Sequence, residues 1–182
     1  MEKISKYLFL IVVGGEVPNA NVEIHDVRWA VGSKIEDTFE NLRNNWLGSK
    51  EGLHIDSYKK IEFVDGYKIS LKNCQTLKSK TNYLIKKRQT SKKLWFVNLG
   101  GYDPNSMQEK HEFGLVVASS SSEAKAKAKS KWLIGFRKKH KDDCINIKNI
   151  DNWEIELSKE NKLPEDKFSP DWFGYMRIDK FV

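Results

Sequence analysis

All four histidines of this chain have an acidic neighbour two positions away. Glu23 lies two positions before His25. Asp56 lies two positions after His54. Residues two apart in a β-strand share one face, so each pair can present its two side chains together. Two imidazoles and two carboxylates suffice for a metal site of the two-histidine, one-carboxylate kind or for a general-base dyad. The same residue types recur later in the chain as Glu109, His111, His140 and Asp142.

These two sets of histidines and carboxylates are not part of any known catalytic motif. The sequence contains no HExxH pattern, no nucleophile elbow and no phosphate-binding glycine loop, and Gly14-Gly15 lacks the strand, turn and helix of a dinucleotide fingerprint. A glutamate beside a histidine also has a structural use, because a buried imidazole needs hydrogen-bond partners. We therefore favour a role in which His25 and His111 are partly buried and pin the preceding loops, residues 16–24 in the first copy. This interpretation assigns no metal ion and no cofactor.

The chain contains an internal duplication with an offset of 86 residues. Residues 8–71 align with residues 94–157 without a gap, and 17 of the 64 pairs are identical, against about four expected from average composition. The matches include both histidine sets, the Gly-Gly pairs, the Pro-Asn pairs and the Trp-Leu pairs. A repeat of this length is one structural unit used twice. The sequence therefore predicts two tandem copies of one small domain.

Each copy has the pattern of two strands, a helix and two further strands. The first strand is the apolar run that ends at the glycine pair, residues 8–15 in the first copy. The second alternates so that His25 shares a face with apolar residues, and a helical pattern follows up to Trp46. Asp65-Gly66 suits the two-residue turn of a closing hairpin. The sequence predicts an α+β fold of two tandem ββαββ repeats, each an antiparallel or mixed sheet with one helix packed on it.

The duplication divides the chain into four segments. The first repeat domain covers residues 1–71, and the second covers residues 94–157. A basic connector, residues 72–93, joins them, and residues 158–182 form an aromatic tail. Large aromatic side chains are usually buried at least in part. We therefore predict that the tail contains a strand that packs on a sheet or covers a sheet edge.

The motifs of the first copy resemble a known bacterial family. Residues 8–71 contain a Gly-Gly pair, Pro-Asn, His-Asp, a serine-capped helix ending in Trp-Leu, and then the stretch GLHIDSY. This order resembles the DUF1543 family, a domain of unknown function whose members hold one or two copies. The second copy keeps the glycines, Pro-Asn, both histidines and the tryptophan, but it loses GLHIDS apart from His140 and Asp142. The resemblance implies the repeated domain and brings no activity, substrate or catalytic residue.

The net charge of +7 comes from the connector. Residues 72–93 carry eight basic side chains and no acidic one. Such a run is a weak sign of nucleic-acid binding, because it does not interleave the aromatic residues that stack on single-stranded bases and matches no groove-reading motif. We favour a solvated connector and keep nucleic-acid binding through residues 72–93 as an alternative.

The apolar run at residues 8–15 predicts a strand rather than a secretory signal, because it recurs at residues 94–101 inside the chain. No stretch approaches the roughly 18 apolar residues of a membrane span. Two cysteines without a CxxC pattern imply neither a disulfide framework nor a zinc site. We therefore expect a soluble, cytoplasmic protein without a membrane partner. Its favoured function is a non-enzymatic binding or interaction module with a protein or small-molecule partner, and a metal-dependent or acid-base enzyme is the alternative.

Overall fold

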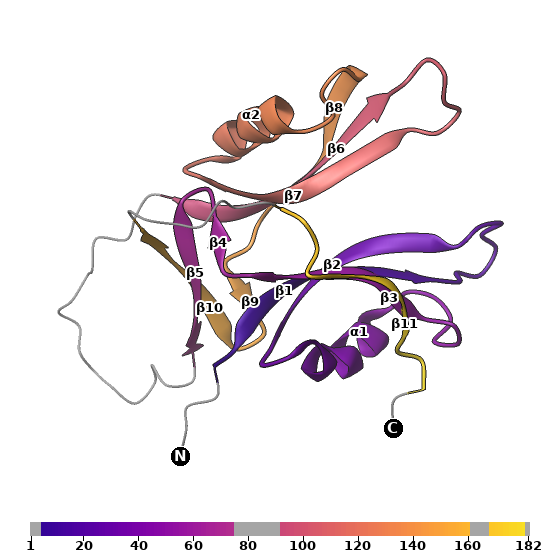
Figure 1. Ribbon diagram of the computed structural model, residues 1–182, viewed down its shortest axis with the longest axis horizontal. Coiled ribbons are helices and arrows are strands. Elements are labelled where there is room, and N and C mark those ends of the chain that lie inside the picture. The colour runs from indigo at the N-terminus through magenta and orange to yellow at the C-terminus, as the bar shows by residue number, and fades with distance from the viewer. Residues whose placement is uncertain (1–4, 75–91, 161–167, 181–182) are drawn as a thin grey trace. The chain divides into compact units, whose positions relative to one another are not determined.

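The computed structural model (Figure 1) describes residues 5–74, 92–160 and 168–180. The chain forms two compact units. Unit 1 comprises Met1–Glu62 and Lys167–Val182, and unit 2 comprises Phe63–Asp166. Both are mixed α/β structures in which every strand pair of the described residues is antiparallel. Most of the predicted connector lies outside the described residues, and no described helix is long and apolar enough to cross a membrane.

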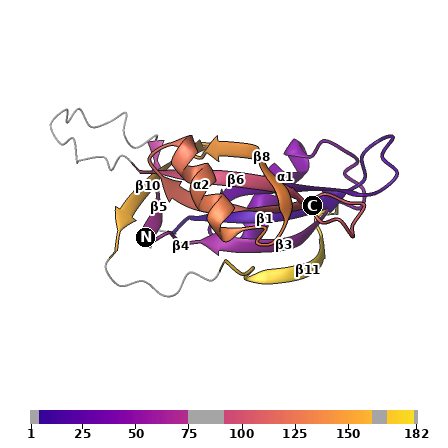
Figure 2. The ribbon, with the colours of Figure 1, turned by 90° about the horizontal axis from the view of Figure 1, so that it is seen from above.

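Unit 1 is a four-stranded sheet with one helical segment packed on it. The strand order is β11-β3-β1-β2. Its strands are β1 (Tyr7–Gly15), β2 (Ile24–Gly32), β3 (His54–Ile61) and β11 (Trp172–Arg177). The helical segment consists of η1 (Ile35–Thr38) and α1 (Phe39–Asn45). Strand β11 lies beside β3 (Figures 1 and 2), so the C-terminal tail adds a strand to the sheet of the first repeat.

The two faces of β1 have different roles. Ile11 and Val13 belong to the same buried cluster as Leu42 of α1. Trp46, at the end of the predicted helical pattern, lies in this cluster with 8% of its surface exposed. Because successive side chains of a strand alternate between faces, Gly14 lies on the opposite face, away from α1. That face carries the candidate functional residues of the unit.

Unit 2 contains two sheets. The first has the order β7-β6-β8, which matches β2-β1-β3 of unit 1, and consists of β6 (Lys93–Tyr102), β7 (Lys110–Ala118) and β8 (Arg137–Asn146). Helix α2 (Ser121–Lys131) packs on it through Ala124 and Ala128. The second has the order β4-β5-β10-β9 and consists of β4 (Phe63–Val64), β5 (Tyr67–Asn73), β9 (Asn149–Ile150) and β10 (Trp153–Lys159).

The closing hairpins of the two repeats meet in this second sheet. Strand β5 pairs with β10 so that Ser70 lies opposite Glu156, its own counterpart in the duplication. This register is the one expected for two copies of a strand related by a two-fold axis. The predicted ββαββ arrangement is not confirmed, because the hairpin of the first repeat leaves the sheet formed by the rest of that repeat. Local periodicity predicts a strand and its faces, but the choice of a distant pairing strand depends on tertiary contacts.

The aspartate in the turn between β4 and β5 has a structural role. Asp65 and Gly66 adopt positive φ angles of 50° and 82°, as the predicted two-residue turn requires. The Asp65 carboxylate accepts a hydrogen bond from the Val117 N–H at 2.9 Å and lies 3.6 Å from Lys127 Nζ. Only 12% of the Asp65 side chain is exposed, so water replaces these contacts poorly.

Replacing Asp65 by alanine should destabilise unit 2 by about 1–3 kcal/mol, because the Val117 N–H loses its acceptor. Alanine also strains the positive φ angle. Asp151→Ala is the matched control, since Asp151 occupies the equivalent turn with a φ angle of 50° and an exposed side chain. Urea unfolding should show the larger loss for Asp65→Ala. Equal losses in the two variants would mean that turn strain alone is responsible.

Candidate metal centres

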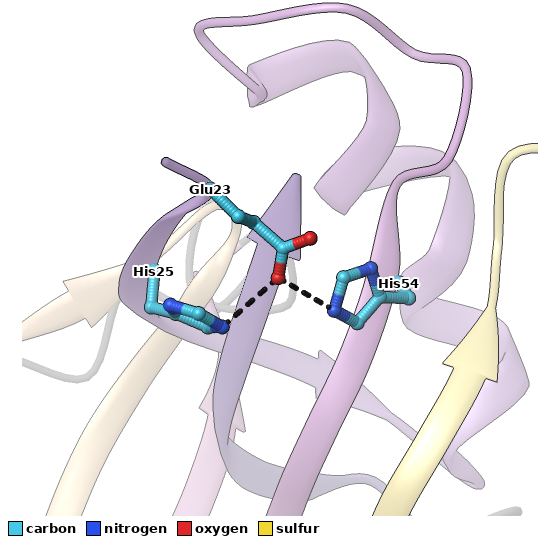
Figure 3. A group of neighbouring side chains, drawn as sticks. All are labelled: Glu23, His25 and His54. Carbon is cyan, nitrogen blue, oxygen red and sulfur yellow. Dashed lines mark ion pairs between the residues drawn. The ribbon is translucent and has the colours of Figure 1, made fainter. Parts of the chain in front are cut away.

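Four side chains of unit 1 converge over Gly14. In the strand register Gly14 lies opposite His25 on β2 and opposite His54 on β3. Glu23 immediately precedes β2, and Asp56 lies on β3. The carboxylate of Glu23 reaches between the two imidazole rings (Figure 3). We call the group Glu23, His25, His54 and Asp56 centre 1.

In centre 1 each histidine nitrogen faces both carboxylates. Glu23 Oε1 lies 3.1 Å from His25 Nε2 and 3.2 Å from His54 Nε2. The Asp56 oxygens lie 3.2 Å and 3.3 Å from the same two nitrogens. Ligands bound tetrahedrally to Zn²⁺ at about 2.0 Å lie about 3.3 Å from one another. The nitrogen-to-oxygen distances of centre 1 are close to this spacing, and Glu23, His25 and His54 can each offer one ligand atom to a shared ion.

The ring of His54 is held so that Nε2 points into centre 1. Its Nδ1 lies 2.9 Å from the carbonyl oxygen of Gly52. A histidine that donates its Nδ1–H to a backbone carbonyl presents the lone pair of Nε2, which is the arrangement of most metal-binding histidines. The side chain of His54 is only 1% exposed. His54 is therefore oriented and shielded in the way that a metal ligand requires.

A β-bulge lies at the aspartate of each centre. The register of β1 and β3 shifts between Val12 and Val13, which leaves Asp56 without a partner on β1. The equivalent shift between β6 and β8 leaves Asp142 without a partner. Bulges occur next to functional sites, where they redirect a side chain. Each aspartate is thus the unpaired residue of a bulge, on the strand that also carries a histidine of its centre.

Glycine at position 14 leaves the space that centre 1 fills. A Cβ atom on Gly14 would lie 2.6 Å from His54 Nε2 and 2.8 Å from Glu23 Oε1, closer than real Cβ atoms approach other atoms. Its φ angle is not positive, so glycine is needed here for close approach rather than for backbone conformation. The same holds at Gly100, where a Cβ atom would lie 2.9 Å from Asp142 Oδ2.

Unit 2 carries the same arrangement, which we call centre 2 and which consists of Glu109, His111, His140 and Asp142. Gly100 lies opposite His111 on β7 and opposite His140 on β8. His140 Nε2 lies 2.9 Å from Glu109 and 3.1 Å from Asp142. His111 Nε2 lies 3.6 Å and 3.3 Å from the same two carboxylates. The Nδ1 of His140 lies 3.1 Å from the carbonyl oxygen of Lys138, which repeats the contact between His54 and Gly52.

Both centres contain carboxylate oxygens that are shielded from solvent and that have no donor when the histidine Nε2 atoms facing them carry a lone pair. They are Asp56 Oδ2 in centre 1, and Glu109 Oε1 and Asp142 Oδ2 in centre 2. A buried acceptor without a donor costs about 1–3 kcal/mol, and more when it is charged. A cation bound among the four side chains would remove that cost. The residues present therefore fit a metal ion.

The structure brings together the residues that the sequence grouped, and it shows how far His25 is buried. The side chain of His25 is 52% exposed, so the ring is about half-buried. His25 is the second residue of β2 and lies at the rim of the sheet, whereas His54 is covered. His25 contacts Asp56 as well as the expected Glu23. The predicted role of His25 in pinning its loop therefore explains its contact with Glu23 but not its contact with Asp56.

Two tyrosines beside the centres were missed by the sequence reasoning. The ring of Tyr175 stacks on His54 with the ring centroids 4.0 Å apart, and Tyr102 lies over His140 at 5.8 Å. The negative charge of Glu109 raises the pKa of Tyr102 above its usual value, so the hydroxyl beside this carboxylate stays protonated. Strand alternation from Gly100 could have found Tyr102, but no local pattern connects Tyr175 with His54.

The fold and the two centres define a duplicated α+β protein with one two-histidine, two-carboxylate site in each repeat. The chain belongs to the family described as Domain of Unknown Function (DUF1543), whose model matches residues 20–71 and 106–157. The resemblance seen in the sequence is thereby confirmed for both copies. Each matched stretch contains all four side chains of one centre.

A solved structure is similar over nearly the whole chain. It is described as the crystal structure of a protein Il1583 from Idiomarina loihiensis, and it is 32% identical in sequence with a TM-score of 0.70. The likeness covers 95% of this chain and 97% of that chain. None of the curated proteins matches. Neither the family description nor the name of the solved structure states an activity, so the function has to be argued from the two centres.

Proposed function

We propose that this protein binds first-row divalent metal ions, one in centre 1 and one in centre 2, with Zn²⁺ as the best fit. The observation that carries the proposal is the repeated contact pattern, in which each histidine Nε2 lies within 3.6 Å of both carboxylates of its centre. Imidazole and carboxylate are ligands for these ions. A divalent ion with two carboxylates and two neutral imidazoles has no net charge, which suits a partly shielded site.

A bound proton explains these contacts less well than a metal ion does. When His54 donates its Nδ1–H to the Gly52 carbonyl, a protonated ring has one further N–H, at Nε2. That N–H would serve two carboxylate oxygens at 3.2 Å and 3.3 Å. A single N–H cannot point well at both of them. His25 faces the same two carboxylates, whereas one cation in the middle satisfies all four groups together.

The ligand types favour zinc among the common divalent ions. Ca²⁺ and Mg²⁺ bind oxygen ligands in larger coordination shells, whereas each centre offers two nitrogens. Zn²⁺ accepts nitrogen and oxygen ligands in small coordination shells, which suits the three or four ligand groups that each centre offers. Fe²⁺, Co²⁺ and Mn²⁺ use the same ligand types and are the next candidates.

Metal analysis of the purified protein, together with calorimetric titration of the metal-free protein by Zn²⁺, tests the proposal. We expect two zinc ions per chain. The variant His25→Ala/His54→Ala should bind one ion, because centre 1 loses both nitrogens. The variant His111→Ala/His140→Ala should also bind one ion, and the variant lacking all four histidines should bind none.

Asp26→Ala is the matched control for these variants. Asp26 is the neighbour of His25 on β2, but its carboxylate pairs with Arg28 at 2.6 Å rather than with centre 1. This variant should bind two ions. The proposal fails if the unaltered protein binds no divalent ion at micromolar concentration, or if the double histidine variants still bind two.

Under this proposal, the ligand of the binding module predicted from the sequence is a metal ion. We also propose that the protein is bacterial and cytoplasmic. A metal-dependent enzyme is the second candidate, because the side chain of His140 in centre 2 is 42% exposed. An exposed ligand leaves room for a substrate beside the ion. The alternative of nucleic-acid binding depends on residues 72–93, most of which lie outside the described residues.

A further inference from the structure

The two centres differ mainly in the exposure of one histidine. The side chain of His54 in centre 1 is 1% exposed, and that of His140 in centre 2 is 42% exposed. The other equivalent side chains are closer in exposure, with the two glutamates, at 39% and 27%, the least alike of them. The structural difference between the centres is therefore greatest at His54 and its counterpart His140.

The C-terminal strand covers this histidine in centre 1. Strand β11 pairs with β3 so that Arg177 lies opposite His54. The ring of Tyr175 stacks on the His54 ring at 4.0 Å with an angle of 29° between the planes. The Tyr175 hydroxyl lies 3.5 Å from the Gly52 carbonyl oxygen, which also accepts the hydrogen bond of His54. The tail thus contacts both the ring and the group that orients it.

The tail is anchored to unit 1 by both apolar and polar contacts. Ile178 is fully buried in the cluster around α1, and its N–H donates to the Leu53 carbonyl at 2.9 Å. The Asp179 carboxylate accepts the Gly52 N–H at 3.0 Å and pairs with Arg177. These contacts flank β3 next to His54. The cover over centre 1 is therefore a fixed part of the folded unit.

Centre 2 has no such cover among the described residues. Strand β8, which carries His140, is an edge strand of the three-stranded sheet. The tyrosine over His140 is Tyr102 of β6, whose ring centroid is 5.8 Å away instead of 4.0 Å. Tyr102 lies near enough to Glu109 of the centre for this carboxylate to raise the pKa of the tyrosine, whereas the Tyr175 hydroxyl lies 3.5 Å from the Gly52 carbonyl oxygen. A polar group thus lies beside the accessible side of centre 2.

We infer that the two centres have different functions: centre 1 retains its metal ion as a structural site, whereas centre 2 exchanges its ion and binds a small oxygen ligand, such as water or a carboxylate, at an additional coordination position beside His140. This inference rests on the proposed metal binding. An ion leaves when its ligands move away in turn and a competitor enters. Tyr175 and β11 restrict both steps at His54. Structural zinc sites are closed, and catalytic zinc sites keep an open position.

The first experiment follows zinc release from the loaded protein into an excess of a chelating dye. We expect two phases of equal amplitude whose rate constants differ roughly tenfold or more, the scale of effect that outer contacts have on metal sites. The fast phase should disappear in His111→Ala, and the slow phase should disappear in His25→Ala. A single phase for both ions, or the opposite assignment of the phases, would overturn the inference.

The second experiment removes the cover. Tyr175→Ala should accelerate the slow phase roughly tenfold or more and leave the fast phase unchanged. Because Tyr175 is 62% exposed, we expect the variant to fold. Phe173→Ala is the matched control on the same strand, with a side chain that is 78% exposed. An unchanged slow phase in Tyr175→Ala, or equal acceleration in both variants, contradicts a role of the tyrosine ring.

A third measurement needs no metal ion and separates the inference from the proposed function. In the metal-free protein, carbethoxylation by diethyl pyrocarbonate should modify His140 readily and His54 slowly, and Tyr175→Ala should make His54 reactive. If His54 is protected in a protein that binds no zinc, the cover over His54 is supported and the proposed metal binding is refuted. If His54 and His140 react equally, the cover over His54 is refuted, even if the protein binds two ions.

The fourth measurement concerns the oxygen ligand. The Co²⁺ form of His25→Ala/His54→Ala, which keeps only centre 2, should change its visible absorption when acetate is added. The Co²⁺ form of His111→Ala/His140→Ala, which keeps only centre 1, should not change. A response of centre 1 equal to that of centre 2, or no response of centre 2, would contradict an open coordination position.

Discussion

Gly100→Ala should strongly weaken metal binding at centre 2 while the protein stays folded. A Cβ atom on Gly100 would lie 2.8 Å from His140 Nε2 and 2.9 Å from Asp142 Oδ2, and closer still to Glu109 Oε1. Strand β6 is paired on both sides, so its backbone cannot move away. Three of the four ligands must therefore shift. We expect zinc affinity at this centre to fall by about 100-fold or more, the upper end of the effects of misplaced ligands.

The control for this variant is the neighbouring glycine. A Cβ atom on Gly101 would lie 3.0 Å from Leu133 Cδ1 and 3.3 Å from Phe136 Cβ, on the face away from centre 2. Gly101→Ala should therefore lower the stability of unit 2 without a comparable loss of zinc affinity. Calorimetric titration in the His25→Ala/His54→Ala background isolates centre 2 for both measurements. Unchanged zinc affinity in Gly100→Ala would argue against a metal ion among these side chains.

Removing zinc should lower the thermal stability of the protein strongly. Each centre joins ligands from two strands and from the loop before one of them, and the unfolded chain does not hold these groups together. A ligand that binds only the folded state stabilises it by about 4 kcal/mol when its free concentration is 1,000 times Kd. For a chain of this size that corresponds to a fall of roughly 8–16 °C in Tm for each centre.

Calorimetric melting with and without a chelator measures this effect. The variant without histidines should melt at the same temperature under both conditions, because it has no nitrogen ligands to lose. Addition of Mg²⁺ to the metal-free protein should not restore Tm, since Mg²⁺ requires an octahedral shell of oxygen ligands. Equal Tm values for the loaded and chelated protein would mean that the four groups of each centre do not depend on an ion.

The burial of the histidines illustrates why the site was predicted only in part. Alternation along β2 placed His25 on one face with apolar residues, and from this its partial burial was inferred. The ring lies at the rim and is about half-buried. Full burial instead falls on His54, because Tyr175 and β11 come from a segment at the other end of the sequence. Periodicity defines a face and not what covers it.

Three features could be predicted from the sequence alone: the duplication, the eight side chains that form the two centres and the turn at Asp65-Gly66. Each of these follows from residue identity, from spacing along a strand or from a local φ requirement. The tertiary structure adds that β5 pairs with β10, that Asp56 and Asp142 lie at bulges, and that the tail covers one centre and not the other. The physical reason is that these features depend on the register between strands far apart in the chain, which is selected by the burial of side chains and backbone hydrogen bonds in the folded unit rather than by local propensity.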